Sequence, residues 1–304
     1  VNMEKVDESG FFAALVSSKK KLSYTYSVEK VNGEVTEYTD PYAFANVTKP
    51  EDYKAFLAGE EKNAAHIFGA HERTVNGVKG VLFNVWAPKA LSVSVVGEFN
   101  KYDGRVHLME RIEDTGVFEL FIPGLAAGCG YMYEIKRQGK GTTRKLDPVS
   151  RQISSVPITA SVVSDENMPD SYAWNDGLWM IKRKKEAGKK KPVTVYEVSL
   201  TDWLKEKSAD ELVDFVKQEG YTHVCFLPVA EYLNEEMNGY STLGYFAVTH
   251  RTGGSDAFKK LVDDCHNAGI GVIIDWNGAY FGTEVKGLYD FDGADAYGYL
   301  KPSL

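Results

Sequence analysis

The alternation of apolar and polar residues changes character near residue 190. Up to about residue 160, apolar residues alternate with polar ones in short runs separated by Gly and Pro, as in residues 80–86 and 91–96. After Pro192, apolar runs of strand length alternate with segments of helical periodicity. The first pattern predicts antiparallel β-sandwiches, and the second predicts parallel strands joined by helices. The sequence therefore predicts a multidomain chain that is β in its first part and α/β in its last.

An internal repeat runs through the first part. GFFAAL at residues 10–15 matches GVFELF at 116–121, YTYSV at 24–28 matches YMYEI at 131–135, and DPY at 40–42 matches DPV at 147–149. The three offsets are 116 − 10 = 106, 131 − 24 = 107 and 147 − 40 = 107. A nearly constant offset predicts two tandem copies of one sandwich.

The first copy is predicted to be partial. Its opening strands, the counterparts of residues 80–113, would fall before residue 1. Either this sandwich is degenerate or the chain begins inside a domain, and the absence of Met at position 1 favours the second alternative. The predicted domains are a partial sandwich over 1–48, a linker with a short helix over 49–79, a complete sandwich over 80–160, a linker over 161–191 and, over 192–304, an α/β part that begins either a barrel or a doubly wound sheet.

The second predicted linker contains a strongly basic run, because seven of the ten residues 182–191 are Lys or Arg. Such a run forms either an anion-binding patch or a solvated linker. No aromatic residues are interleaved with it and the whole chain is acidic, so the solvated linker is favoured.

Three parallel strands are predicted after Pro192, over residues 193–200, 222–228 and 270–274. Ser208 begins a helix as its cap, with Glu211 completing a capping box, and Ser255 is predicted to cap a second helix. Residues 270–274 are rich in β-branched side chains and predict a strand buried on both faces. Asp275 then lies at the carboxyl end of this strand, where ligands gather in parallel sheets, although an Asp that braces a loop is an equal alternative.

Composition and charge exclude several classes of partner. The formal net charge of −8 gives no general attraction to nucleic acid or to an anionic membrane. No apolar run approaches the length of a membrane span, and the first residues lack the apolar core of a signal peptide. The three cysteines have no metal-binding spacing and no cofactor motif is present, so a cytoplasmic protein with reduced thiols and no cofactor is expected.

Motifs in both parts carry a family resemblance. The predicted sandwich contains VWAP at 85–88, VVGEFN at 95–100 and GVFELFIPG at 116–124, and the α/β part contains VYEV at 195–198, LPVAE at 227–231 and GIGVIIDW at 269–276. In this order and near this spacing, they resemble the glycogen (1,4-α-glucan) branching enzymes of the α-amylase superfamily. The resemblance implies starch-binding-type sandwiches followed by the first three βα units of an incomplete TIM-type (β/α)8 barrel, so that the chain is expected to be truncated at both ends. It also implies α-glucan (glycogen, amylose or amylopectin) as the partner.

The same resemblance implies sugar-binding residues. Asp275 corresponds to the aspartate of the family's first conserved region, in the donor sugar site, and Tyr240 corresponds to a tyrosine that stacks on a sugar ring there. Tyr280 stands where the family has a His that binds a sugar hydroxyl. Tyr102 falls where such sandwiches often place a tryptophan that stacks on the polymer, and a partly exposed loop tyrosine is an equal alternative.

Four polar sugar contacts of the family are altered in this chain. Tyr280, Tyr232 and Ser199 each replace a His, and Ser241 replaces a Gln. Each unmade hydrogen bond costs roughly 1–3 kcal/mol in a desolvated site. We therefore expect weak catalysis at best.

The catalytic groups of the family are also missing. Retaining glycosyl transfer needs two carboxylates about 5–5.5 Å apart, and the family supplies both after the third barrel strand, beyond Leu304. The 304 − 192 + 1 = 113 residues from Pro192 cannot close a barrel, which needs on the order of 250. Glu197, Glu231 and Asp275 are poor substitutes, so no catalytic residue is assigned. The parent reaction would transfer an α-1,4-glucan segment to a 6-hydroxyl, and the alternative is a non-catalytic α-glucan-binding protein or degenerate pseudoenzyme.

Overall fold

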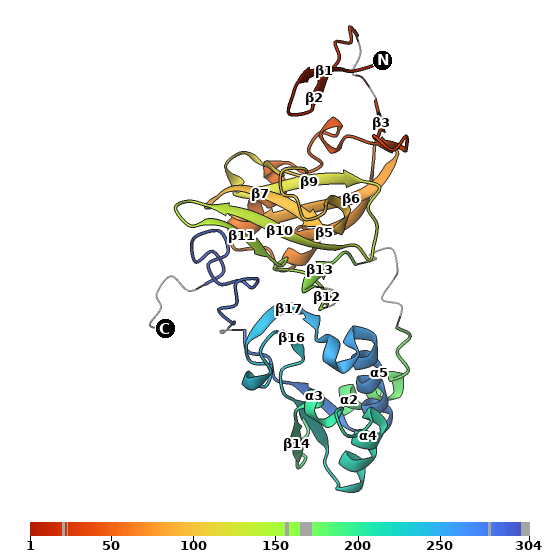
Figure 1. Cartoon of the computed structure of the whole chain (residues 1–304). Coiled ribbons are helices and arrows are strands. Elements are labelled where there is room, and N and C mark those ends of the chain that lie inside the picture. The colour runs from red at the N-terminus through yellow and green to blue at the C-terminus, as the bar shows by residue number, and fades with distance from the viewer. Residues whose placement is uncertain (20–21, 23, 156–157, 165–171, 279–280, 299–304) are drawn as a thin grey trace. The chain divides into compact units, whose positions relative to one another are not determined.

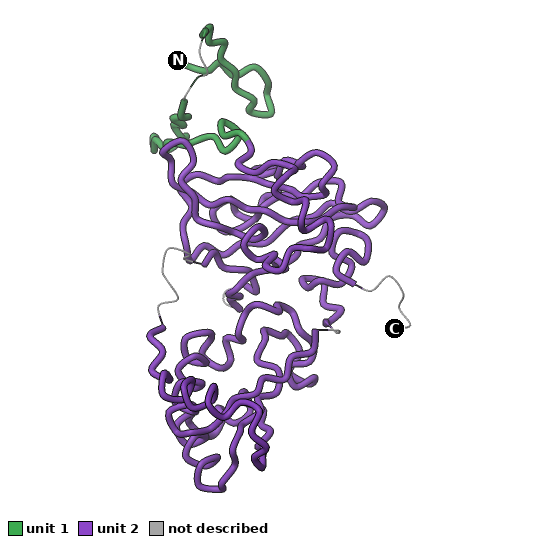
Figure 2. Tube along the Cα trace, turned by 180° about the vertical axis from the view of Figure 1, so that it is seen from behind, with its two compact units in different colours: residues 1–45 green, residues 46–304 purple. Residues whose placement is uncertain are grey.

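The computed structural model describes the chain except for residues 20–21, 23, 156–157, 165–171, 279–280 and 299–304. It divides into two compact units, residues 1–45 and residues 46–304 (Figure 2).

Residues 1–45 form two antiparallel hairpins. β1 (Glu4–Asp7) pairs with β2 (Phe11–Ala13), and β3 (Tyr26–Glu29) pairs with β4 (Val35–Tyr38). Most of their apolar side chains are exposed, Phe11 to 63%. The partial sandwich predicted over residues 1–48 therefore takes the form of two separate two-stranded sheets.

A β-sandwich begins the second unit (Figure 1). One sheet has the order β5–β6–β9–β8, and in the other β10 pairs with β7, β11 and β13, which in turn pairs with β12. Alternate side chains of β6 and β10, such as Phe83 and Tyr133, point into one fully buried core between the sheets. The strands are β5 (Gly69–Val75), β6 (Val78–Trp86), β7 (Ala90–Gly97), β8 (Glu110–Arg111), β9 (Val117–Pro123), β10 (Gly130–Arg137), β11 (Gly141–Lys145), β12 (Ile153–Ser154) and β13 (Ala160–Val162).

The sandwich begins earlier than the boundary predicted at residue 80. β5 pairs along its whole length with β6, although its sequence GAHERTV is mostly polar. The short helix α1 (Lys54–Leu57) precedes it, within the segment where a short helix is predicted. Tyr53 and Phe68 from this segment are buried against the edge of the sandwich.

Three parallel strands follow in the order β14–β15–β18, as predicted. They are β14 (Val195–Val198), β15 (His223–Phe226) and β18 (Gly271–Ile274). α2 (Gly177–Glu186) precedes the sheet, and α3 (Leu200–Trp203), α4 (Ala209–Gln218) and α5 (Gly254–Asn267) connect its strands. Val224 and Phe226 are fully buried against the apolar faces of α4 and α5.

Two predictions for this part need correction. Ser208 caps α4 with the predicted capping box, but α5 begins at Gly254 with Gly253 as its cap, so Ser255 lies inside the first turn. β18 is not buried on both faces, because Ile273 and Ile274 are 40% and 45% exposed. Among the described strands β18 pairs with β15 alone, and no further strand or layer covers these two side chains.

A hairpin and a C-terminal segment connect the α/β part to the sandwich. β16 (Ala230–Tyr232) and β17 (Thr242–Val248) pair antiparallel in the long loop after β15. Leu243 and Ala247 of β17 are buried in one cluster with Val96 and Met132 of the sandwich. In residues 284–298, Phe291 is fully buried in the sandwich core, and Asp290 forms ion pairs of 2.8 Å with both Arg137 and Lys140 of the β10–β11 hairpin.

Candidate functional site

The carboxyl ends of the parallel strands bring two predicted residues together. The backbone N–H of Asp275 donates to the carbonyl of Phe226 at 2.9 Å, which continues the β15–β18 ladder and fixes Asp275 at the rim of the sheet. The hydroxyl of Tyr240 donates to the Asp275 carboxylate. The third predicted rim residue, Tyr280, lies outside the described residues.

The electrostatics of this rim favour neutral Tyr240. Its hydrogen bond to Asp275 raises the pKa of Tyr240 to about 12, with burial and the carboxylate of Glu197 adding to the effect. Burial, Glu197 and Asp275 also raise the pKa of the Cys225 thiol, which lies on the strand between them. A thiol with a raised pKa is a poor nucleophile, so Cys225 is not activated for nucleophilic attack at this rim.

A buried carboxylate supports the loop that carries Tyr240. Glu231 is only 2% exposed. It accepts hydrogen bonds from the backbone N–H and Nδ1 of His250 at 2.9 and 3.0 Å and from Arg251 Nη1 at 2.9 Å. The sequence predicts Glu231 only as a poor substitute for a catalytic carboxylate, and nothing in the local pattern signals its partners. With both oxygens held by donors, Glu231 serves to fix the two ends of the loop together.

Tyr102 lies on the sandwich, in the turn after the short 3-10 helix Glu98–Asn100. Its ring packs against the cluster of Val96 and Met132. The guanidinium of Arg144 lies 5.7 Å from the ring centroid, and its Nη2 donates to the carbonyl of Tyr102 at 2.9 Å. A sugar stacked on that face of the ring would have to displace Arg144. Among the described residues no hydrogen bond joins Tyr102 to Tyr240 or Asp275.

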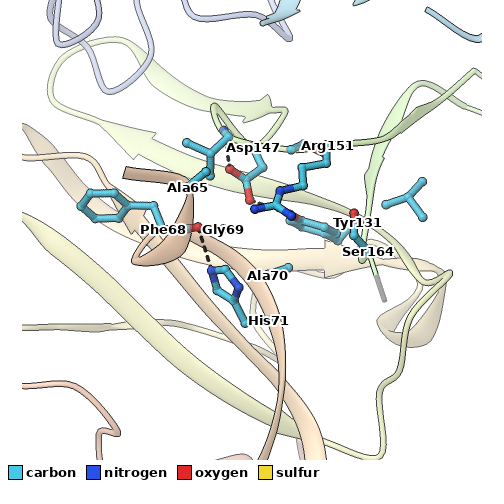
Figure 3. A pocket seen from close by; sticks show the side chains of 12 residues that line it. Ala65, Phe68, Gly69, Ala70, His71, Tyr131, Asp147, Arg151 and Ser164 are labelled. Atoms are coloured by element: carbon cyan, nitrogen blue, oxygen red, sulfur yellow. Dashed lines mark hydrogen bonds between the residues drawn. The ribbon is translucent and has the colours of Figure 1, made fainter. Parts of the chain in front are cut away.

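A small pocket lies at one end of the sandwich (Figure 3). Its lining includes Asp147, His71 and Tyr131, none of which the sequence predicts to contact sugar. Tyr131 already donates to Asp147 at 2.5 Å, and His71 Nε2 is 2.8 Å from the Phe68 carbonyl. These three side chains therefore serve the fold.

Two features are absent from the described residues. No group of three or more His, Cys, Asp and Glu side chains is arranged to hold a metal ion. None of the described helices combines the length and the apolar character needed to cross a membrane.

Comparison with known proteins gives consistent similarities. The family model described as carbohydrate-binding module 48 (isoamylase N-terminal domain) matches residues 67–150. A 1,4-alpha-glucan branching enzyme GlgB from Methylococcus capsulatus is 39% identical over 99% of this chain and 42% of its own length. One from Nitrosococcus oceani is 40% identical over 94% of this chain and 39% of its own length. The chain thus spans about two fifths of the length of these relatives.

A solved structure shares the fold. The crystal structure of a putative alpha amylase from Salmonella typhimurium matches with a TM-score of 0.53 and 24% identity, over 72% of this chain and 34% of that one. At this identity the match supports a β-sandwich followed by an amylase-type domain as the architecture of the chain.

Proposed function

Because the chain belongs to the 1,4-alpha-glucan branching enzyme family, we propose that it binds α-1,4-glucan and serves the branching reaction of that family. That reaction cuts an α-1,4-glucan, holds the segment as a glycosyl-enzyme and transfers it to a 6-hydroxyl. The contribution of these 304 residues is substrate binding, with glycogen, amylose and amylopectin as its ligands.

One observation carries this proposal. The segment that matches the carbohydrate-binding module, residues 67–150, nearly coincides with the strands β5 to β11 of the buried-core sandwich. A sandwich with its own core is a rigid scaffold for a polysaccharide surface. We place the glucan on this sandwich, with Tyr102 and its neighbour Arg144 in contact with the polymer.

The parallel strands β14, β15 and β18 are proposed to be the first three strands of a TIM-type barrel. In such a barrel the carboxyl ends of the strands form the active-site face, and Asp275 and Tyr240 would lie at the donor sugar. The retaining reaction needs two carboxylates at short separation. Glu231 is committed to His250 and Arg251, so we propose that this chain has no branching activity of its own.

Migration of the chain in native gels that contain glycogen tests the proposal. We expect retardation relative to a gel without polysaccharide, and we expect Tyr102→Ala to abolish most of it. Tyr42→Ala, at a tyrosine that is 56% exposed in the first unit, is the matched control and should migrate as the wild type does. Equal migration of the wild type with and without glycogen would refute glucan binding.

Iodine staining of amylose tests the second half of the proposal. The chain incubated with amylose should leave the colour of the iodine complex unchanged, because the Glu231 carboxylate is already held by His250 and Arg251. A loss of colour that the Asp275→Asn variant does not produce would contradict the assignment of a binding role without catalysis.

A further inference from the structure

Three residues that differ from the family's sugar contacts, Ser199, Tyr232 and Ser241, have hydrogen-bond partners inside this chain. Ser199 is the N-cap of α3, where its hydroxyl accepts from the Asp202 backbone N–H at 3.2 Å. This bond satisfies a helix-terminal donor that would otherwise need water. A side chain engaged in this way serves the helix and does not offer the imidazole donor that the family has at this position.

Tyr232 is also integrated into the fold. It is only 5% exposed, and its hydroxyl donates to Thr201 Oγ1 at 3.1 Å. The guanidinium of Arg251 lies 4.5 Å from its ring centroid, within the range of a cation–π contact. The larger aromatic ring therefore fills and stabilises the base of the loop in place of a sugar-binding imidazole.

Two adjacent side chains join the loop to the segment after β18. Tyr240 donates to Asp275, and Ser241, which is 5% exposed, donates to Glu284 Oε1 at 2.7 Å. Gly282 permits the second contact, because a Cβ at this position would collide with the Glu284 carboxylate and the Ser241 hydroxyl. Asp275 and Glu284 thus both accept hydrogen bonds from neighbouring residues of one loop.

We propose that this rim is closed on itself: Tyr240 occupies Asp275 in place of a sugar hydroxyl, and the Ser241–Glu284 bond holds Tyr240 there. The proposal rests on the assignment of Asp275 and Tyr240 to the donor sugar site. A sugar hydroxyl must replace a hydrogen bond to a charged acceptor that is already made, which lowers its affinity for the rim by about tenfold to a hundredfold. Glucan binding by this chain is then confined to the sandwich.

The hydrogen bond itself can be tested without sugar. Tetranitromethane nitrates tyrosine through its phenolate, which the bond to Asp275 suppresses at Tyr240. Peptide mapping should find Tyr240 nitrated at least about fivefold faster in Asp275→Asn than in the wild type, because a pKa difference of one unit changes the phenolate fraction tenfold. Nitration of Tyr221 in the same sample should be unchanged. Equal rates at Tyr240 in both proteins would overturn the proposal.

Sugar binding at the rim has a local reporter in Trp276. This side chain follows Asp275, is 62% exposed and lies 5.7 Å from the Tyr245 ring. In protein labelled with 5-fluorotryptophan, the fluorine resonance of Trp276 is assigned as the one that is lost in the Trp276→Phe variant. This resonance is then followed during titration with maltotriose. We expect Tyr240→Phe, which keeps the ring and frees Asp275, to bind maltotriose at least about tenfold more tightly at this reporter than the wild type. Tyr221→Phe should behave as the wild type.

Two outcomes would contradict the closed rim. One is that the wild type and Tyr240→Phe bind maltotriose at Trp276 with the same affinity. The other is that maltotriose shifts the Trp276 resonance in neither protein. A failure of glucan binding as a whole is recognised separately, because glycogen would then not retard the wild type in native gels. The nitration rates would still report on the Tyr240–Asp275 bond in that case.

Discussion

The two copies of the internal repeat build the same local structure in opposite environments. In the second copy Tyr131 and Tyr133 donate to Asp147 Oδ2 at 2.5 and 3.3 Å. In the first copy their counterparts Tyr24 and Tyr26 donate to Asp40 Oδ2 at 2.6 and 3.5 Å. Each Asp also accepts from the backbone two residues later at 2.9 Å.

The strand registers agree as closely. Tyr26 faces Tyr38 in the first copy and Tyr133 faces Lys145 in the second, which are offsets of 133 − 26 = 107 and 145 − 38 = 107. In the β1–β2 hairpin, Lys5 faces Phe12, as Arg111 faces Phe118 in β8–β9, with offsets of 111 − 5 = 106 and 118 − 12 = 106. Both hairpins of the first unit therefore repeat hairpins of the sandwich.

The copies differ in what covers them. In the sandwich β9 pairs with β6, and β10 pairs with β7. Among the described residues, the corresponding edges of β2 and β3 have no such partner strands. Phe118 is 3% exposed and its counterpart Phe12 is 51% exposed. Local sequence thus determines hairpin register and the Tyr–Asp hydrogen bonds, whereas burial depends on strands elsewhere in the chain.

The environment also changes the cause of the pKa shifts. Burial is the main reason that the pKa of Tyr131 lies well above its usual value. For Tyr24, the hydrogen bond to Asp40 is the main cause of the raised pKa. Burial likewise raises the pKa of Asp147, partly offset by its three hydrogen bonds. Burying these groups therefore costs electrostatic free energy in the second copy. The exposed groups of the first copy do not carry this cost.

The largest difference between the copies is expected at the aromatic pair Phe118 and Phe12. Phe118→Ala should lower the free energy of unfolding by about 3–5 kcal/mol, because it leaves a cavity in a packed sheet. Phe12→Ala should change it by less than about 0.5 kcal/mol. Urea denaturation followed by tryptophan fluorescence measures both. Equal losses would mean that the first unit is packed as tightly as the second.

A smaller difference is expected at the carboxylates. Asp147→Ala leaves two buried tyrosine hydroxyls without their acceptor and should cost about 2–3 kcal/mol. Asp40→Ala exposes its partners to water and should cost less than about 1 kcal/mol. Asp147→Asn also lacks the charge but keeps one acceptor oxygen for the tyrosine hydroxyls, so we expect it to lose less stability than Asp147→Ala at pH 7. Equal losses in the two variants would show that the missing acceptor contributes nothing to the cost.

The smallest effect is a dependence of stability on pH at Lys145, whose counterpart in the first copy is Tyr38. Burial lowers the pKa of Lys145 to about 8 from its ordinary 10.5. Between these two values the unfolded chain binds more protons at this site than the folded chain, so stability should rise with pH across this window. Relative to Lys145→Met, we expect the wild type to gain about 1–2 kcal/mol from pH 8 to 10.5. A stability difference that does not change with pH would mean that the Lys145 ammonium group is solvated, like the exposed Tyr38 side chain at the matching position of the first copy.

The sequence predicts the parts of the fold that depend on local pattern. The repeat, the three parallel strands and the Ser208 cap follow from short-range periodicity and capping chemistry. Sequence reasoning missed β5, because His71, Glu72 and Arg73 mask its alternation. It also missed the burial of Phe291 in the sandwich core, because that contact joins segments that lie about 200 residues apart in the chain.

The candidate site divides in the same way. Asp275 and Tyr240 could be placed together from the strand ends and the family resemblance, and the structure joins them by a hydrogen bond. The bonds of Ser241 to Glu284 and of Tyr232 to Thr201 could not be foreseen. They depend on how three segments that are separate in the sequence pack together, which no periodicity encodes.

A crystal structure of the chain with bound maltoheptaose tests the central claim most directly. The account predicts sugar density on the sandwich beside Tyr102 and Arg144, with the Tyr240 hydroxyl still bonded to Asp275. Sugar hydroxyls on Asp275 with Tyr240 displaced, and a bare sandwich, would contradict it.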